Sequence, residues 1–220
     1  MDMFIGLIVN FIPVLIAILL HEIAHGYMAF LLGDDTAKRQ GRLSLNPIKH
    51  VDYFGTIILP ALLIFSKAGF IFGWAKPVPV NFQALRNPKR DVILVSAAGI
   101  IMNLLLAAVS AVLLHLTPYI SHPFLQAVIG LFFLNMIVFN VFLAVFNALP
   151  IPPLDGSKIL FGWLDKPWAV RYVNADRIGL AALVLLAFIL PEIGRSFGVN
   201  LNLFGMYVIR FSKFLISFLV

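Results

Sequence analysis

Two long stretches of the chain, residues 92–116 and 127–149, contain no Asp, Glu, Lys or Arg. Each exceeds the roughly 20 apolar residues that an α-helix needs to cross the hydrocarbon core of a bilayer. Of all residues, 61% are hydrophobic and only 12% are charged, whereas a soluble domain is about half apolar and a quarter charged. Such a chain cannot cover itself with polar surface, so we expect an all-α polytopic membrane protein in contact with the lipid bilayer.

The formal net charge of +6 and the absence of cysteine narrow the possible functions. A chain without cysteine has no disulfides, Fe–S clusters or thiolate metal sites. In a soluble protein the excess of basic residues would indicate nucleic-acid binding. In a chain this apolar, it is better explained by Lys and Arg collecting in the loops on one side of a membrane. We therefore expect no nucleic-acid partner.

The N-terminal apolar run, residues 3–20, is predicted to be a retained transmembrane helix that continues to Leu32. A signal peptide is disfavoured because Asp2, and no Lys or Arg, precedes the run and no small-residue cleavage site follows it. Near the C-terminus, residues 178–190 form a shorter apolar segment, and residues 203–220 are expected to be a last span or a helix lying in the interface. Together these segments predict about four to six transmembrane or half-membrane helices.

The distribution of basic residues predicts the orientation of the chain. Three loops are rich in Lys and Arg: residues 33–53, 67–91 and 150–177. Two others hold at most one: residues 117–126 and 191–202. Basic loops remain in the cytoplasm, so we expect the three rich loops on that side.

This topology requires residues 54–66 to dip into the membrane and return. The stretch is short and holds Gly55 and Pro60, which suits a re-entrant segment better than a full span. The next segment, residues 73–81 (GWAKPVPVN), is predicted to be an extended strand or edge because of its prolines and valines. A plain surface loop is the alternative.

The first helix contains His21-Glu22-Ile23-Ala24-His25, an HExxH motif. Residues four apart share a helix face, so both imidazoles can bind one metal ion. Glu22 can then act as general base toward a water activated by that ion. Ionisable groups inside a membrane helix are expensive in lipid and mark functional sites by default. The alternative is a hydrogen-bonded structural cluster.

Zinc requires a third protein ligand and an open fourth position. The extended motif HExxHxxGxxH fails, because Met28 and Leu31 occupy its Gly and His positions. The only other glutamate, Glu192, belongs to the loop side that is poor in bases. The remaining histidines, His50, His115 and His122, are expected to be ordinary surface or interfacial residues.

Asp155 is the best candidate for the third ligand. It follows the apolar stretch 127–149 in the sequence NALPIPPLDG. In the expected topology, that stretch and the first helix both run from outside to inside, so His25 and Asp155 lie near the same membrane face. The prolines forbid a regular helix before the aspartate, and Gly156 permits a tight turn behind it. A helix-capping role for Asp155 is the alternative.

These motifs resemble the site-2 protease family of intramembrane zinc metalloproteases, in which HExxH on one helix is joined by a distant LDG-type motif, here Leu154-Asp155-Gly156. Asn147 matches the family's asparagine before the prolines. Gly99-Ile-Ile-Met-Asn103 matches its GxxxN motif, although Ile100 stands where the family usually has proline. The resemblance covers roughly residues 15–165 and is closest to compact prokaryotic members without a PDZ or CBS domain.

The resemblance implies one Zn²⁺ per chain, a single transmembrane protease domain over residues 1–220, a catalytic core of about residues 1–165 and C-terminal helices at about 178–220. It implies an integral protein of a prokaryotic cell membrane that cleaves transmembrane protein substrates (regulated intramembrane proteolysis), with an active site opening to the cytoplasm. The implied zinc ligands are His21, His25 and Asp155. The implied catalytic residues are Glu22 and Asn147. The implied substrate-binding residues are Asn103, Pro77, Val78, Pro79 and Val80.

Two other functions remain open from the sequence. The first is another membrane zinc hydrolase of HExxH type, which would take a glutamate as third ligand. The second is a non-catalytic membrane scaffold, or a transporter with a polar site near the midplane. Metal content and the effect of changing Glu22 to Gln would separate these alternatives.

Overall fold

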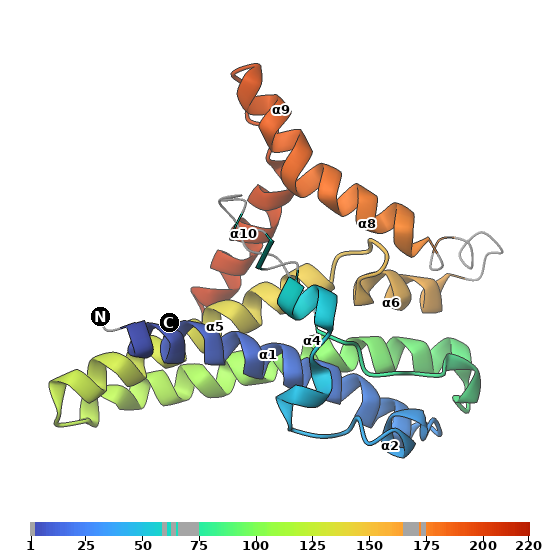
Figure 1. Ribbon diagram of the computed structural model, residues 1–220, viewed down its shortest axis with the longest axis horizontal. Helices are drawn as coiled ribbons and strands as arrows, with labels where there is room; N and C mark the ends of the chain where they lie inside the picture. Colours follow the sequence, from blue (N-terminus) through green and yellow to red (C-terminus); the bar gives the residue numbers. More distant parts are fainter. Residues whose placement is uncertain (1–2, 59–60, 63–64, 66–74, 165–171, 173–174) are drawn as a thin grey trace.

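The computed structural model describes residues 3–58, 61–62, 65, 75–164, 172 and 175–220 (Figure 1). Three long helices dominate it: α1 (Met3–Leu31), α4 (Pro88–Leu116) and α5 (Pro123–Asn147). Proline occupies the first position of both α4 and α5, where its missing N–H costs no hydrogen bond. The described residues contain no β-strand.

Among the described residues, four helical segments are long and apolar enough to cross a membrane: Phe4–Leu31, Pro88–Tyr119, Pro123–Asn147 and Asp176–Ser196. The second includes the short 3₁₀ helix η4 (Thr117–Tyr119) that extends α4. This confirms the prediction of an all-α polytopic membrane protein.

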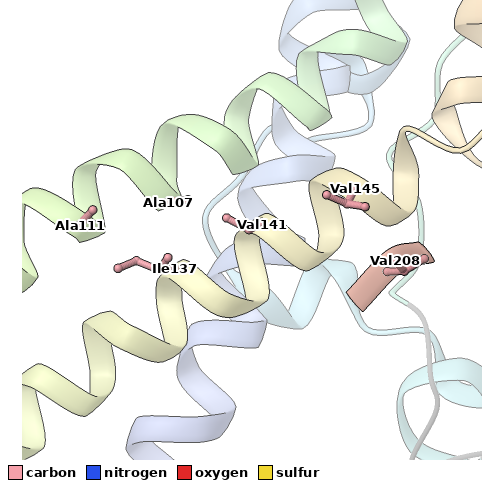
Figure 2. Close-up of a cluster of buried hydrophobic side chains, with 6 residues drawn as sticks. All are labelled: Ala107, Ala111, Ile137, Val141, Val145 and Val208. Atoms are coloured by element: carbon pink, nitrogen blue, oxygen red, sulfur yellow. The ribbon is translucent and has the colours of Figure 1, made fainter. Parts of the chain in front are cut away.

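Helices α1, α4 and α5 pack against one another and form the core of the molecule (Figure 1). Figure 2 shows a buried apolar cluster between α4, α5 and the last helix. Its members are Ala107, Ala111, Ile137, Val141, Val145 and Val208. The alanines let α4 and α5 approach closely, which matters in lipid because association there depends on close packing and hydrogen bonds.

Pro13 interrupts the hydrogen bonding of α1. It has no N–H to donate to the carbonyl of Val9 four residues earlier. The amide of Asn135 on α5 donates to that carbonyl at 2.8 Å and also lies 3.1 Å from the Asn10 side-chain oxygen. A polar side chain of a neighbouring helix thus satisfies the group that proline leaves free, as membrane helices require.

Short elements connect α1 to α4: α2 (Thr36–Arg39), η1 (Pro47–His50), the π-turn η2 (Tyr53–Ile58) and η3 (Phe82–Ala84). Residues 59–60, 63–64 and 66 of the segment 54–66, for which we predicted a re-entrant path, lie outside the described residues. The path of that segment therefore stays a prediction.

Residues 75–81 have no regular secondary structure, so the strand expected over 73–81 is absent from its described part. Its backbone bonds instead to groups from the preceding loop and from α1. Lys76 N–H donates to the His50 carbonyl at 2.8 Å, and the Arg42 guanidinium donates to the carbonyls of Lys76 and Pro77 at 2.9 and 3.2 Å. Asn81 N–H donates to Asp34. Pro77 and Pro79 have no N–H to donate to a partner strand.

The chain after α5 forms α6 (Asp155–Trp163), which packs against α4. It continues as α8 (Asp176–Val184), the π-turn η5 (Leu185–Ile189) and α9 (Leu190–Ser196). These last three elements make one helical segment that continues through Pro191, beyond the apolar segment 178–190. The π-turn η5, which ends two residues before the proline, allows this, because locally wider winding accommodates a residue that cannot donate to the helix.

The final helix, α10 (Leu203–Ile216), has 14 residues. At 1.5 Å per residue it is about 21 Å long, too short to cross a hydrocarbon core of about 30 Å. In Figure 1, α8 and α9 extend away from the three-helix core and α10 returns to α5. Of the two paths considered for residues 203–220, a full span is therefore disfavoured.

Candidate metal centre

The structure brings together the three residues for which a metal-binding role was predicted. His21 and His25 lie one turn apart on α1, and Asp155 is the first residue of α6. The two His Nε2 atoms lie 3.0 Å apart, and each lies 3.2 Å from Asp155 Oδ2. The side chains are 9%, 11% and 8% exposed, respectively. The three ligand atoms thus form a nearly equilateral, almost buried triangle.

Hydrogen bonds at the far side of each imidazole fix which nitrogen carries the proton. His25 Nδ1 lies 2.7 Å from the Val95 carbonyl oxygen, which can only accept, so this nitrogen donates. His21 Nδ1 lies 2.7 Å from Asn103 Oδ1, likewise an acceptor. Neutral histidines held in this way present unprotonated Nε2 atoms to the triangle, which is the usual arrangement behind a metal ligand.

The triangle suits a bound cation. Two Nε2 lone pairs and a carboxylate oxygen face each other, and the buried Oδ2 of Asp155 has no hydrogen-bond donor among the described residues. Ligand atoms about 2.0–2.2 Å from a tetrahedral zinc ion lie about 3.3–3.6 Å apart, slightly more than the 3.0–3.2 Å found here. Two imidazoles and one carboxylate are also a donor set that zinc accepts, with one position left open.

The turn between α5 and α6 places Asp155. Helix α5 ends at Asn147, and the proline-rich turn is closed by bonds from Ile151 N–H to the Leu149 carbonyl and from Leu154 N–H to the Ile151 carbonyl. A Cβ on Gly156 would lie 2.2 Å from the carbonyl oxygen of Ala148. Gly156 is therefore needed for the close approach of α6 to the end of α5. The capping position of α6 is Leu154, so the capping alternative for Asp155 does not apply.

The two oxygens of Asp155 face different partners. Oδ1 lies 3.6 Å from the ammonium of Lys158, which is one turn further along α6. Oδ2 faces the histidines. Lys158 thus favours an orientation in which one oxygen remains directed toward the metal position.

The GxxxN motif on α4 lies directly behind the histidines. A Cβ on Gly99 would lie 2.5 Å from His21 Cε1 and 2.5 Å from His25 Nε2. Asn103, one turn further, is fully buried, and its Oδ1 accepts a hydrogen bond from His21 Nδ1. Gly99 therefore makes room for the imidazoles and Asn103 orients one of them. This placement makes Asn103 a support for His21, and the substrate-binding role that the resemblance implies stays a prediction.

Glu22 is half-buried and points to the segment 75–81. Its Oε2 accepts a hydrogen bond of 2.8 Å from Val78 N–H. Gly26 permits this contact, because a Cβ there would lie 2.5 Å from Val78 Cγ1. Of the predicted substrate-binding residues in this segment, Val78 is buried, Pro77 is exposed, and Pro79 and Val80 are intermediate. The segment thus lies beside the metal centre without forming a strand.

Asn147 does not join the triangle. Its amide donates to the Leu143 carbonyl of its own helix at 3.0 Å. Its catalytic role therefore stays a prediction. Glu192 forms an exposed ion pair with Arg195 at 2.8 Å. His115 and His122 are exposed as expected, whereas His50 is buried, and its Nε2 lies 3.0 Å from the Ser44 carbonyl oxygen.

Sequence reasoning missed Asn140 of α5, which is fully buried and bonds to Asn103. A usable signal was present, since an amide inside an uncharged transmembrane stretch needs a partner and is a candidate for function. It also missed Arg42, because nothing in a loop sequence shows which carbonyls a guanidinium will reach.

Comparisons with known proteins agree with this geometry. The model for Peptidase family M50 matches residues 119–190, a stretch that includes Asn147 and Asp155. "Putative zinc metalloprotease YwhC" of Bacillus subtilis is 40% identical over 183 residues, covering 82% of this chain and 80% of the relative. "Putative zinc metalloprotease Rip2" of Mycolicibacterium smegmatis is 33% identical over 186 residues, covering 83% of this chain and 67% of the relative.

The corresponding Rip2 protein of Mycobacterium tuberculosis is 31% identical over 195 residues, covering 87% of this chain and 71% of the relative. No solved structure gives a significant match. The similarity to YwhC extends over most of both chains, and the bundle has membrane-spanning helices with a His/Asp metal centre. This chain therefore belongs to peptidase family M50, the site-2 protease family of intramembrane zinc metalloproteases.

Proposed function

We propose that this protease hydrolyses peptide bonds in or near transmembrane segments of membrane proteins, with His21, His25 and Asp155 holding one Zn²⁺ per chain. The observation that carries the assignment is the triangle of three buried acceptor atoms separated by 3.0–3.2 Å. The metal, when bound, supplies Lewis acidity toward the scissile carbonyl and lowers the pKa of water.

Glu22 acts as general base and then as general acid. It adjoins His21 in the sequence but does not belong to the triangle, so its carboxylate remains available for proton transfer. In our proposal it takes the proton of the attacking water and passes it to the leaving amine. The bond from Val78 N–H holds this carboxylate in one orientation.

The segment Pro77–Val80 is proposed to receive the substrate as an extended chain. A helical substrate hides its peptide bonds within the helix, so it must be unwound before attack. A peptide segment without regular secondary structure beside Glu22 can pair with an unwound chain by strand addition through the carbonyls of Val78 and Val80 and the Val80 N–H, since Pro77 and Pro79 have no N–H and the Val78 N–H bonds Glu22. Asn147 is proposed to donate its amide to the oxyanion, which requires it to exchange the Leu143 carbonyl for the substrate.

We propose that the site opens to the cytoplasm. His25 lies in the last third of α1, and the chain beyond α1 enters a loop that contains Lys38, Arg39 and Arg42. Asp155 likewise follows the end of α5 and precedes Lys158. Since basic loops remain in the cytoplasm, both sequence neighbourhoods of the metal centre favour that side.

The test compares the two glutamates of the chain. We expect purified Glu22→Gln protein to retain one zinc per chain and to lose cleavage of peptides that carry single transmembrane segments, with products measured by mass spectrometry. Glu192→Gln is the matched control, because Glu192 lies in an exposed ion pair away from the site, and it should retain both properties. Cleavage by Glu22→Gln at the wild-type rate would refute the mechanism.

A further inference from the structure

Two asparagines lie side by side in the middle of the three-helix core, Asn103 on α4 and Asn140 on α5. Both are 0% exposed. Asn103 Nδ2 donates to Asn140 Oδ1 at 2.8 Å. Because no water reaches such groups in a bilayer, each amide must find its partners inside the protein.

The hydrogen bonds of this pair run in one direction. Asn140 Nδ2 donates to the Met136 carbonyl at 2.8 Å, so its Oδ1 must face Asn103. Asn103 Nδ2 donates to that oxygen and to the Ala17 carbonyl at 3.2 Å, so its Oδ1 must face His21. His21 Nδ1 then has to carry the proton, and Nε2 keeps its lone pair.

The direction of this relay is fixed at its far end by a backbone group. A carbonyl cannot donate, so the Met136 carbonyl decides which way Asn140 points. Asn140 at 2.8 Å and, more weakly, the Ala17 carbonyl at 3.2 Å together decide which way Asn103 points. His25 has no such relay, because its Nδ1 bonds directly to the Val95 backbone carbonyl. The tautomer of His21 therefore depends on side chains that can rotate, and that of His25 does not.

We propose that Asn140 is a positioning residue of the metal centre, which acts through Asn103 to keep His21 Nε2 unprotonated and directed at the metal. The inference rests on the proposed function in one respect, namely that Zn²⁺ binds His21 through Nε2. Outer hydrogen-bond partners of metal ligands typically contribute 10- to 100-fold in affinity. Because Asn140 is one step further from the metal than Asn103, we expect the lower end, about tenfold.

Asn135 offers a matched control on the same helix. It too donates across to a neighbouring helix, at 2.8 Å to the Val9 carbonyl, but it has no connection to His21. We would measure the dissociation constant of Zn²⁺ by chelator competition, and the absorption spectrum of bound Co²⁺, for purified protein in detergent. The variants are Asn140→Leu, Asn140→Asp and Asn135→Leu.

We expect Asn140→Leu to weaken Zn²⁺ binding about tenfold and to alter the Co²⁺ spectrum. Asn140→Asp should restore both, because a neutral carboxyl can donate to the Met136 carbonyl and accept from Asn103. Asn135→Leu should bind Zn²⁺ as the wild type does. Unchanged binding by Asn140→Leu, or equal weakening by Asn135→Leu, would overturn the proposal.

Two further outcomes are a variant that does not fold and a failure of the proposed function itself. If Asn140→Leu does not fold, Asn140→Ser decides in the same way, since its shorter side chain cannot span the gap to Asn103. Failure of the wild-type protein to bind Zn²⁺, or retention of Zn²⁺ by His21→Ala, would instead contradict the proposed function on which the inference depends.

Discussion

The three-helix core and the C-terminal helices use polar side chains in opposite ways. In the core, Asn103, Asn140 and His21 are buried and bond to one another. In α9, Glu192 and Arg195 pair at the surface, with side chains 65% and 75% exposed. Desolvated polar groups are costly unless partnered. The comparison teaches that these buried amides of the core support the metal centre, whereas an exposed pair such as Glu192 and Arg195 contributes little to stability.

The strongest test of this difference removes the ligand that joins the core to α6. We expect Asp155→Ala to lose stoichiometric zinc, because the two histidines alone leave the three-ligand set incomplete. Cleavage of transmembrane peptides should fall below detection. Metal analysis of the purified protein and the peptide assay check this. Retention of one zinc per chain would show that another residue is the third ligand, as in the HExxH hydrolases that use glutamate.

A smaller effect is expected from Gly99→Ala. The added Cβ would lie 2.5 Å from His25 Nε2, so α4 must move away or the imidazoles must turn. We expect zinc binding to weaken by roughly tenfold to a hundredfold, as for other disturbed outer contacts. Gly130→Ala on α5 is the control, since its Cβ would meet nothing closer than 3.7 Å. Equal zinc affinities for the two variants would contradict the packing argument.

Arg42→Ala should lower activity while leaving the metal in place. The guanidinium holds the carbonyls of Lys76 and Pro77, and these residues position the Val78 N–H that bonds Glu22. We expect about a tenfold loss of kcat/KM, consistent with loss of charged hydrogen bonds of about 1.5 kcal/mol. Arg39→Ala removes an arginine whose partner is the exposed Asp35 and should leave kcat/KM unchanged. A drop in zinc content with Arg42→Ala would assign it a different role.

The smallest effect is expected in the C-terminal helices. Arg195→Ala breaks an exposed ion pair, which typically contributes no more than about 1 kcal/mol. Thermal unfolding in detergent should shift by a few degrees at most, with zinc content and cleavage unchanged. A loss of zinc or of activity would contradict the difference between the two regions, because it would show that a surface residue of α9 affects the metal centre.

Much of the candidate site was predictable because charge is scarce in this sequence. Glu22 and Glu192 are the only glutamates, so HExxH in an apolar helix stood out, and Asp155 was left as the best-placed third ligand. The long helices followed equally directly from their uncharged stretches. Both predictions rest on the free-energy cost of placing a polar group in lipid, which keeps charged residues out of membrane helices unless they have a function.

The remaining features depend on which faces of the helices meet. Predicting that Gly99 packs against two imidazoles would require knowing that α4 meets α1 at His21 and His25. The prolines of residues 75–81 favoured an extended chain, but its partners are side chains from distant loops, and so no strand forms. At Pro191 the helix continues because of a π-turn, which residue propensities do not specify.

The bond between Asn135 and the Val9 carbonyl, which Pro13 leaves free, has a consequence for the axial register of α1. Apolar helices in lipid gain little from one alignment over the next, so α1 could slide along α5 by a turn, about 5.4 Å. A second polar contact, from the Asn103 amide to the Ala17 carbonyl, holds α1 closer to His21. The Asn135 bond therefore fixes the register of the N-terminal part of α1, whereas the contact at Ala17 keeps the histidines at the height of Asp155.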